Sequence, residues 1–247
     1  MDRSTDRRWA LLDNLRGLTL TSMILYHGCW DMVYIFGQDW AWYRSAAAFW
    51  WQQSICWTFI LLSGFCFSLG SRPLRRGLEI SAAGALVTAV TLAFMPGNRV
   101  IFGVLTFLGA AALLLCLLDR PLRRLPPALG LAGAAALFVL LRDVNEGYLG
   151  FRGLRLAPLP QGLYRNLLTA FLGFPPQEFW STDYFSLLPW FFLFLTGYFL
   201  FRLGRGRALP AGGRRWPLFN FLGRHSLLIY LLHQPVVYGG LWVLFGR

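Results

Sequence analysis

The sequence contains no lysine and little charge of either sign, since only 14% of its 247 residues are charged. An average soluble domain carries about 25% charged residues. Hydrophobic residues make up 56% of the chain and aromatic residues 17%, so the composition excludes an ordinary soluble domain. The formal net charge of +12 comes entirely from arginine. Because the arginines lie in short segments between apolar runs, they favour topology signals and contacts with anionic lipid headgroups over nucleic-acid binding.

Cysteine is also scarce, and the four cysteines form no metal-binding pattern. Cys29, Cys56, Cys66 and Cys116 all lie within apolar runs, without the CxxC or histidine-rich spacing of a metal site. We therefore expect neither a metal site nor a disulfide framework. The chain also lacks an internal repeat, which disfavours the secondary transporters that are built from inverted repeats.

Seven apolar runs are long enough to cross a bilayer, which takes about 20 residues. They cover residues 9–36, 42–70, 74–95, 99–118, 125–142, 183–203 and 217–245. The pattern predicts an all-α polytopic membrane helix bundle of about seven transmembrane helices, forming a single domain over residues 1–247. One long connection, 143–182, separates the fifth and sixth runs, and residues 161–173 within it are expected to form a short surface helix.

Arginine placement predicts the orientation of the chain in the membrane. Clusters of arginine lie at the connections that follow the second, fourth and sixth runs, at Arg72, Arg75, Arg76, Arg120, Arg123, Arg124, Arg202, Arg205, Arg207, Arg214 and Arg215. Basic loops stay on the cytoplasmic side. We therefore expect a cytoplasmic N-terminus, an external C-terminus and an external 143–182 loop, in a multi-pass protein of the bacterial inner membrane.

Four ionisable residues of the first run share one helical face. An α-helix turns about 100° per residue, so Asp13, Arg16, His27 and Asp31 fall near one line. Each charge at the membrane centre costs about 2.5–3.5 kcal/mol, and such groups usually face a protein interior or a wet cavity. We expect Asp31 to accept a hydrogen bond from the His27 ring, which would make the other ring nitrogen a good general base. The alternative for Asp13 and Arg16 is that they form an ion pair with a structural role only.

This topology divides the polar residues of the runs into an inner set and an outer set. The inner set, beside the basic loops, comprises Arg16, Ser63, His225 and Ser226. The outer set comprises His27, Asp31, Gln53, Arg99 and Asp183. The inner set suits the phosphates of a nucleotide-like donor, and we group His233 and Gln234 with it. Pro235 cannot donate a backbone hydrogen bond, so the last helix either lines a cavity there or is only kinked. From the outer set we expect His27 and Asp31 to be catalytic and the other three to bind the acceptor.

Several segments together resemble a known family. Leu12-Asp13-Asn14-Leu15-Arg16-Gly17 opens the first run, and Tyr230-Leu231-Leu232-His233-Gln234-Pro235 lies in the last. Both resemble the heparan-alpha-glucosaminide N-acetyltransferase catalytic-domain family. That family lies within a transmembrane acyltransferase superfamily whose signature includes an Arg and a His separated by ten residues, and Arg16 and His27 have this spacing.

The resemblance implies a membrane acyltransferase of the glycan-modifying kind. It would move an acyl group, expected to be acetyl, from cytosolic acyl-CoA to a sugar hydroxyl or amine on the other side of the membrane. His27 matches the catalytic histidine of such proteins. The expected partners are the lipid bilayer, acyl-CoA and a sugar or glycan acceptor, while the sequence leaves the oligomeric state open, a homodimer included.

Two other functions fit the same residues. Asp13, Arg16, His27 and Asp31 could form the relay of a transporter or proton-coupled carrier. Alternatively, His27 and His233 could be the axial ligands of a haem. The acyltransferase is the leading hypothesis, because the resemblance covers nearly the whole chain.

Overall fold

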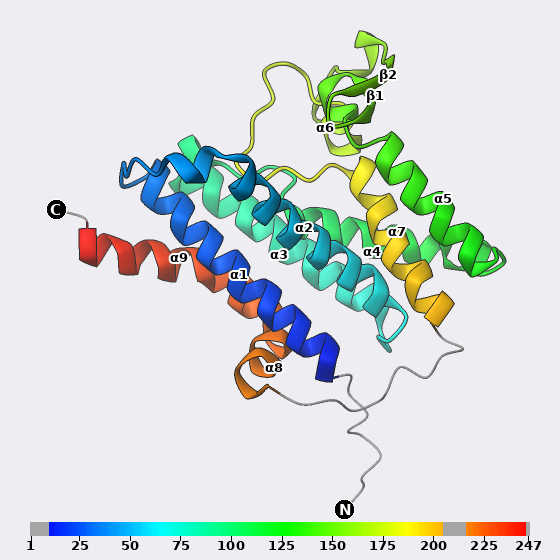
Figure 1. Ribbon diagram of the computed structural model, residues 1–247, viewed down its shortest axis with the longest axis horizontal. Helices are drawn as coiled ribbons and strands as arrows, with labels where there is room; N and C mark the ends of the chain where they lie inside the picture. The colour runs from blue at the N-terminus through cyan, green and yellow to red at the C-terminus, as the bar shows by residue number, and fades with distance from the viewer. Residues whose placement is uncertain (1–9, 205–215, 246–247) are drawn as a thin grey trace, which may run out of the picture. The chain divides into compact units, whose positions relative to one another are not determined.

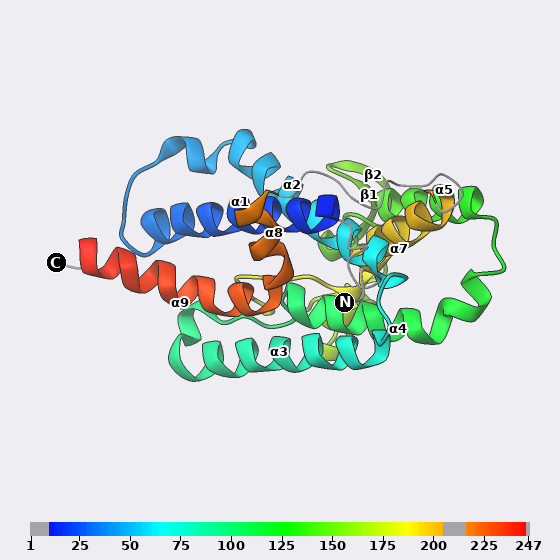
Figure 2. The same ribbon diagram turned by 90° about the horizontal axis from the view of Figure 1, so that it is seen from below.

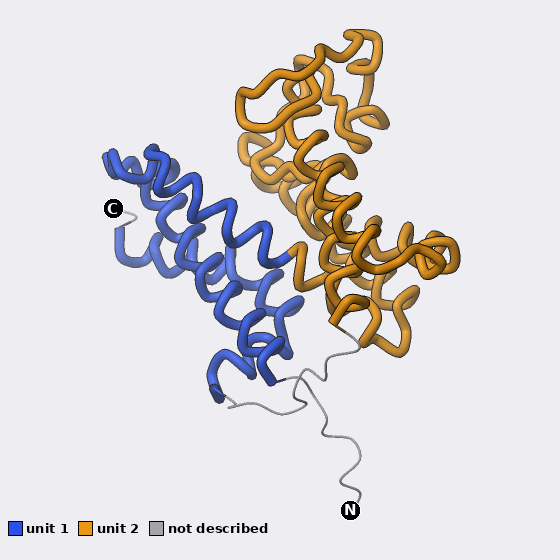
Figure 3. The backbone as a smooth tube through the Cα atoms, turned by 45° about the vertical axis from the view of Figure 1, so that its right-hand side comes forward, with its two compact units in different colours: residues 1–59, 207–247 blue, residues 60–206 orange. Residues whose placement is uncertain are grey.

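The computed structural model describes residues 10–204 and 216–245. It is 74% helical and divides into two compact units, residues 1–59 with 207–247 and residues 60–206 (Figure 3). Each unit is described by itself below. Four of the arginines that predicted the orientation, Arg205, Arg207, Arg214 and Arg215, lie outside the described residues.

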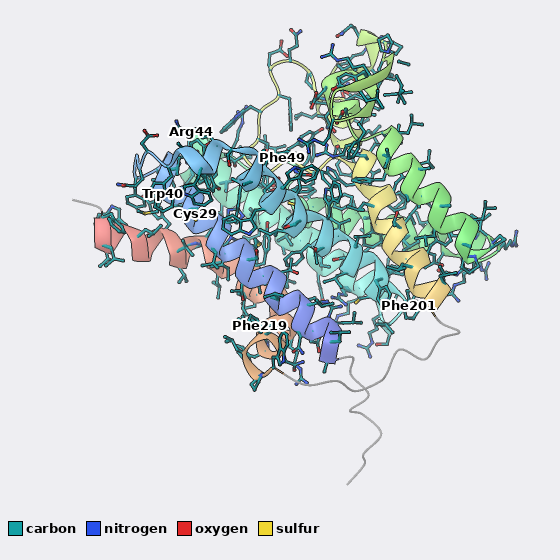
Figure 4. All side chains as sticks on the ribbon, in the orientation of Figure 1. Cys29, Trp40, Arg44, Phe49, Phe201 and Phe219 are labelled. Atoms are coloured by element: carbon teal, nitrogen blue, oxygen red, sulfur yellow. The ribbon has the colours of Figure 1, made fainter. Side chains whose placement is uncertain are left out.

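The first unit is built on the long first helix. Its elements are α1 (Ala10–Tyr34), the short 3-10 helix η2 (Ala41–Arg44), the first part of α2 (Ala46–Phe67), α8 (Pro217–Arg224) and α9 (Ser226–Phe245). Trp40 and Arg44, labelled in Figure 4, lie in the connection between α1 and α2. Leu20 and Met23 of α1 pack against Ile55 of α2 and form one core cluster of this unit, and Val33, Tyr43 and Ala48 form another.

Small residues let α8 approach α1 closely. A Cβ atom at Gly17 of α1 would overlap the backbone of Phe219, and one at Gly223 of α8 would overlap the backbone of Asp13. Phe219 is labelled on α8 in Figure 4. Helix pairs that carry glycine at their contact can bring their backbones together in this way.

The prediction of one helix over residues 217–245 is wrong. The run forms two helices, because His225 leaves helical geometry (φ −103°, ψ 21°) between α8 and α9. The break separates the part held against α1 at Gly17 and Gly223 from the longer helix α9. Pro235, by contrast, lies inside α9 without ending it.

The second unit contains two pairs of neighbouring helices. Its helical elements are the last part of α2, α3 (Pro73–Phe94), the 3-10 helix η3 (Pro96–Asn98), α4 (Val104–Leu122), α5 (Pro127–Leu140) and α7 (Leu187–Gly204). Helix α3 runs beside α4 (Figure 2), and α5 runs beside α7 (Figure 1). The aromatic side chains of Phe194, Tyr198 and Phe199 of α7 are almost completely buried in this unit.

The long connection of the second unit holds a β-hairpin that the sequence patterns did not predict. It comprises η4 (Val144–Glu146), β1 (Tyr148–Phe151), β2 (Leu154–Pro158), η5 (Gln161–Leu163) and α6 (Leu167–Leu172). Strands β1 and β2 are antiparallel, and they lie beyond the ends of α5 and α7 (Figure 1). Arg152 and Gly153 have φ values of 51° and 88°, the left-handed conformation that a two-residue hairpin turn needs. The surface helix predicted at 161–173 is confined to η5 and the short α6.

Five stretches of the described residues are long and apolar enough to cross a membrane, where seven were predicted. They are α3, α4, Pro127–Glu146, α7 and α9. Helices α1 and α2 have 25 and 22 residues, but polar side chains such as His27, Asp31 and Gln53 lower their mean hydropathy. The protein is an integral multi-pass membrane protein with an all-α helix bundle. The number of seven, the cytoplasmic N-terminus and the single domain stay predictions.

Candidate active site

In the first unit, α1 and α9 bring four polar residues together, which we call the α1–α9 polar cluster: His27, Asp31, His233 and Gln234. The ring centroids of His27 and His233 lie 5.0 Å apart at an interplanar angle of 62°. The side-chain amide of Gln234 donates a hydrogen bond of 2.7 Å to Asp31 Oδ1. His27 and Asp31, which were predicted to be catalytic, thus lie beside His233 and Gln234, which were predicted to bind the donor.

The predicted hydrogen bond from His27 to Asp31 is wrong. Asp31 is completely buried, its Oδ1 atom accepts from Gln234, and its Oδ2 atom has no hydrogen-bond partner. Spacing along α1 suggested the pair, but α9 approaches α1 at this point and supplies a different donor. The aspartate therefore binds across to a second helix instead of orienting the histidine one turn away.

His233 has a defined tautomer. Its Nδ1 atom lies 2.5 Å from the carbonyl oxygen of Tyr230, and because a carbonyl only accepts, Nδ1 carries the proton. In the neutral ring Nε2 is then an acceptor, and this atom is buried without a hydrogen-bond partner.

Unmet hydrogen-bonding capacity concentrates in this cluster. Across the described residues, four buried side-chain nitrogen or oxygen atoms have no partner, and three of them are Asp31 Oδ2, His233 Nε2 and Gln234 Oε1. The fourth is Asn220 Nδ2 on α8. Leaving such a group unpaired costs about 1–3 kcal/mol, so folded proteins seldom retain one without a reason. Three together mark a place where a polar ligand can bind.

Aromatic residues surround the cluster end of α1. Tyr26 packs against Trp51 of α2 and against Tyr43, in each case with ring centroids 5.2 Å apart. Trp51 Nε1 donates to Ser22 Oγ at 2.8 Å, and the Tyr43 hydroxyl donates to the Tyr26 carbonyl at 3.2 Å. These contacts hold the helix segment that carries His27 in one position.

Gln53, predicted to bind the acceptor, uses its amide within α2. Its Nε2 atom donates to Gln52 Oε1 at 2.6 Å, and its Oε1 atom accepts from Trp57 Nε1 at 3.0 Å. The side chain is buried. These contacts favour a role in fixing the aromatic residues of α2.

At the start of α1, Asp13 binds two arginines. Arg16 Nη1 lies 3.1 Å from Asp13 Oδ1, so the structural alternative for this pair is present in the fold. Arg224 of α8 lies 3.9 Å from Asp13 Oδ2, and this residue was not among the predicted site residues. Arg224 is the last residue of α8, directly before the break at His225. A helix boundary predicted at His225 would have drawn attention to it. Two guanidinium groups around one carboxylate leave one formal positive charge.

The other predicted donor-binding residues lie in different places. His225 ends α8, where its ring packs 4.6 Å from Phe221, and Ser226 begins α9. Ser63 belongs to the second unit, where it lines a pocket of about 50 Å³ together with Arg76. That volume holds only a few water-sized groups.

Asp183 and Arg99, both in the second unit, join two segments of the chain. Asp183 Oδ2 accepts from the Val104 backbone N–H at 3.0 Å, which caps the start of α4. Arg99 donates to the Trp180 carbonyl at 3.2 Å and lies over its ring. Burial raises the pKa of Asp183 to about 6, although the hydrogen bond from Val104 opposes that rise. Their partners favour a structural role for both residues.

Over the described residues, no group of three or more His, Cys, Asp and Glu side chains could hold a metal ion. A haem between His27 and His233 does not fit, because the two rings are in direct edge contact.

A family model described as "Heparan-alpha-glucosaminide N-acetyltransferase, catalytic" matches residues 8–235. The chain belongs to this family. No curated protein and no solved structure shows significant similarity to it. The match spans α1 and extends into α9 as far as Pro235, so it includes all four residues of the α1–α9 polar cluster.

Membership confirms the resemblance and disfavours the transporter. It places the protein among membrane acetyltransferases, which in general use acetyl-CoA as the donor. It also implies a lipid bilayer and a glycan acceptor.

Proposed function

We propose that the protein transfers an acetyl group from cytosolic acetyl-CoA to a hydroxyl or amine of an extracytoplasmic sugar, in a bacterial inner membrane, with His27 as the general base. The observation that supports this most strongly is the α1–α9 polar cluster. It joins the histidine of the family signature to three buried acceptor atoms that have no protein partner. A cluster of this kind on membrane helices is a functional site by default.

The reaction needs a base beside the acceptor. The acceptor oxygen or nitrogen attacks the thioester carbonyl, its proton moves to His27, and the carbon–sulfur bond breaks. The departing thiolate then takes the proton from the imidazolium. A positioned base contributes about 10²–10⁴-fold to such a rate. Asp31, one turn further along α1, stabilises the imidazolium by its negative charge.

Arginines at the start of α1 provide a place for the phosphates of the donor. Arg16 uses one nitrogen for Asp13, and the other N–H groups of its fork suit phosphate oxygens. Arg224 adds a second guanidinium beside the same carboxylate. His225 and Ser226 lie next along the chain from Arg224, so the same region includes three of the predicted donor-binding residues. Ser63 belongs to the second unit, and its role in donor binding stays a prediction.

His27→Ala tests this function directly. Purified protein is incubated with radiolabelled acetyl-CoA and a panel of amino sugars, and label transfer and free CoA are measured. We expect the variant to lose about 10²–10⁴-fold in rate while its melting temperature stays close to that of the wild type. Leu25→Ala is the matched control, because Leu25 is an exposed residue of the same helix. Full activity of His27→Ala would refute the assignment, and uptake of substrate without consumption of acetyl-CoA would indicate a transporter.

A further inference from the structure

The α1–α9 polar cluster contains more hydrogen-bonding capacity than the proposed transfer uses. We infer that Asp31, His233 and Gln234 bind the non-reacting hydroxyl groups of the acceptor and so determine which acceptors are used. This inference rests on the proposed function. It moves His233 and Gln234 from donor binding, where the sequence had grouped them, to acceptor selection.

All three unpaired atoms are of one kind. Asp31 Oδ2 belongs to a carboxylate, which only accepts. Gln234 Oε1 is identified as the oxygen because the other end of the amide donates to Asp31 Oδ1 at 2.7 Å. His233 Nε2 is the acceptor nitrogen because Nδ1 donates to the Tyr230 carbonyl. The cluster therefore complements a ligand that supplies several donors.

That pattern selects among ligand chemistries. Hydroxyl and amine groups can donate to these atoms, whereas sulfate and carboxylate groups carry only acceptors at neutral pH, and every anionic group, phosphate included, would be repelled by Asp31. A ring with several hydroxyl groups can satisfy separate acceptors and still leave one amine or hydroxyl free to react, whereas a simple amine has no donor besides its reacting group. A site built to hydrogen-bond a substrate hydroxyl strongly rejects an analogue that lacks it, since its own buried groups are then left unpaired.

The placement of these atoms also suits a positioning role. His233 and Gln234 are adjacent on α9, and the His233 ring lies 5.0 Å from the His27 ring. A sugar held by its hydroxyl groups on Asp31, His233 and Gln234 would present a neighbouring hydroxyl or amine to His27. Holding the nucleophile in this way supplies a large part of the rate of such transfers.

A pair of substitutions at His233 tests the inference. His233→Asn keeps a side-chain N–H near the position of Nδ1 and removes the acceptor at Nε2, whereas His233→Gln places an amide oxygen near Nε2. The probes are glucosamine and cyclohexylamine, which both carry one amine on a six-membered ring, while only glucosamine has hydroxyl groups. The measured quantity is kcat/KM for glucosamine divided by kcat/KM for cyclohexylamine.

We expect His233→Asn to lower this ratio about 3- to 10-fold, as the loss of one uncharged hydrogen bond predicts, and His233→Gln to retain most of it. Gln234→Met, which removes a second acceptor, should lower the ratio by a similar factor. Val236→Ala, at an exposed position of α9, is the control that should leave the ratio unchanged.

The outcomes separate this inference from the proposed function. Wild type that does not prefer glucosamine, or variants that slow transfer to both amines equally, would overturn the inference and leave the transferase intact. Wild type that releases no CoA with either amine would overturn the proposed function itself. Should His233→Asn fail to give a folded protein in a thermal melt, Gln234→Met makes the same comparison through a different atom.

Discussion

Asp31 and Asp183 are two aspartates in hydrophobic surroundings, one in each unit, and their hydrogen bonds differ. Asp183 accepts the Val104 N–H and, with Arg99, belongs to a set of contacts that joins the start of α4 to the segment before α7. Asp31 accepts from Gln234 with one oxygen and leaves the other without a partner. The contacts of Asp183 and Arg99 connect two segments of the chain, which favours a structural role, whereas the unused buried acceptor of Asp31 is available to a ligand. The comparison assigns Asp183 to structure and Asp31 to function.

Among the substitutions that test this comparison, Asp31→Asn should show the largest effect. Asparagine keeps an oxygen for Gln234 but removes the buried charge, so the melting temperature should hold or rise. Acetyl transfer should fall about 10- to 100-fold, as expected when a hydrogen bond to a charged group worth about 1.5–3 kcal/mol is lost. Rates of CoA release and thermal melts of the same preparations measure both quantities.

Leu18→Ala, at an exposed position of α1, is the control for that experiment. If instead Asp183→Asn abolished transfer while Asp31→Asn left it intact, the assignment of the two aspartates would be reversed.

Gly17→Ala tests whether the first unit depends on the close approach of α1 and α8. The added methyl group would overlap the backbone of Phe219, and such overpacking typically costs about 1–3 kcal/mol. Gly28→Ala is the matched control in the same helix, since its Cβ would lie 3.6 Å from Val237 Cγ1, an ordinary contact. Melting temperatures in detergent should fall for the first variant and stay level or rise for the second. Equal values would mean that α8 can move away from α1 at little cost.

The smallest effect concerns the pH dependence of stability. Burial raises the pKa of Asp183 from its ordinary value of 3.8 to about 6, so the folded protein binds this proton more tightly than the unfolded chain does. The stabilisation that comes from this proton is complete at a pH below 3.8 and is lost as the pH rises through about 6. The melting temperature of Asp183→Asn minus that of the wild type should therefore increase as the pH rises from about 4 to about 7.

Glu178→Gln, an exposed change of the same charge in the same connection, should show no such trend. A constant difference between wild type and Asp183→Asn across this range would contradict the raised pKa of Asp183.

Much of the fold was predictable because apolar runs directly reflect membrane helices. The predicted runs 9–36 and 74–95 correspond to α1 (Ala10–Tyr34) and α3 (Pro73–Phe94) within a few residues. The hairpin of the long connection was missed because its turn, Arg152-Gly153, carries a weak local signal. The break at His225 was missed, although Gly223, Arg224 and His225 interrupt the apolar run there, because the apolar residues on both sides predict a single span.

The candidate site was predicted as a set of residues but not as a set of contacts. His27, Asp31, His233 and Gln234 were all identified from the sequence. The pairing of Asp31 with His27 was inferred from spacing on one helix and is wrong, since Gln234 from another helix takes that bond. Arg224 was missed because a basic residue in a membrane protein is by default a topology signal.

By itself, the sequence determined the membrane class and the row of ionisable residues on α1, because composition and helical spacing are local properties of a chain, and its motifs indicated the family by resemblance. Only the tertiary structure decided which of these side chains meet. Asp31 and Gln234 are 203 positions apart, and their hydrogen bond depends on where the backbones of α1 and α9 approach each other. Glycines such as Gly17 and Gly223 set such approaches through tertiary packing, which acts between segments that are distant in the sequence.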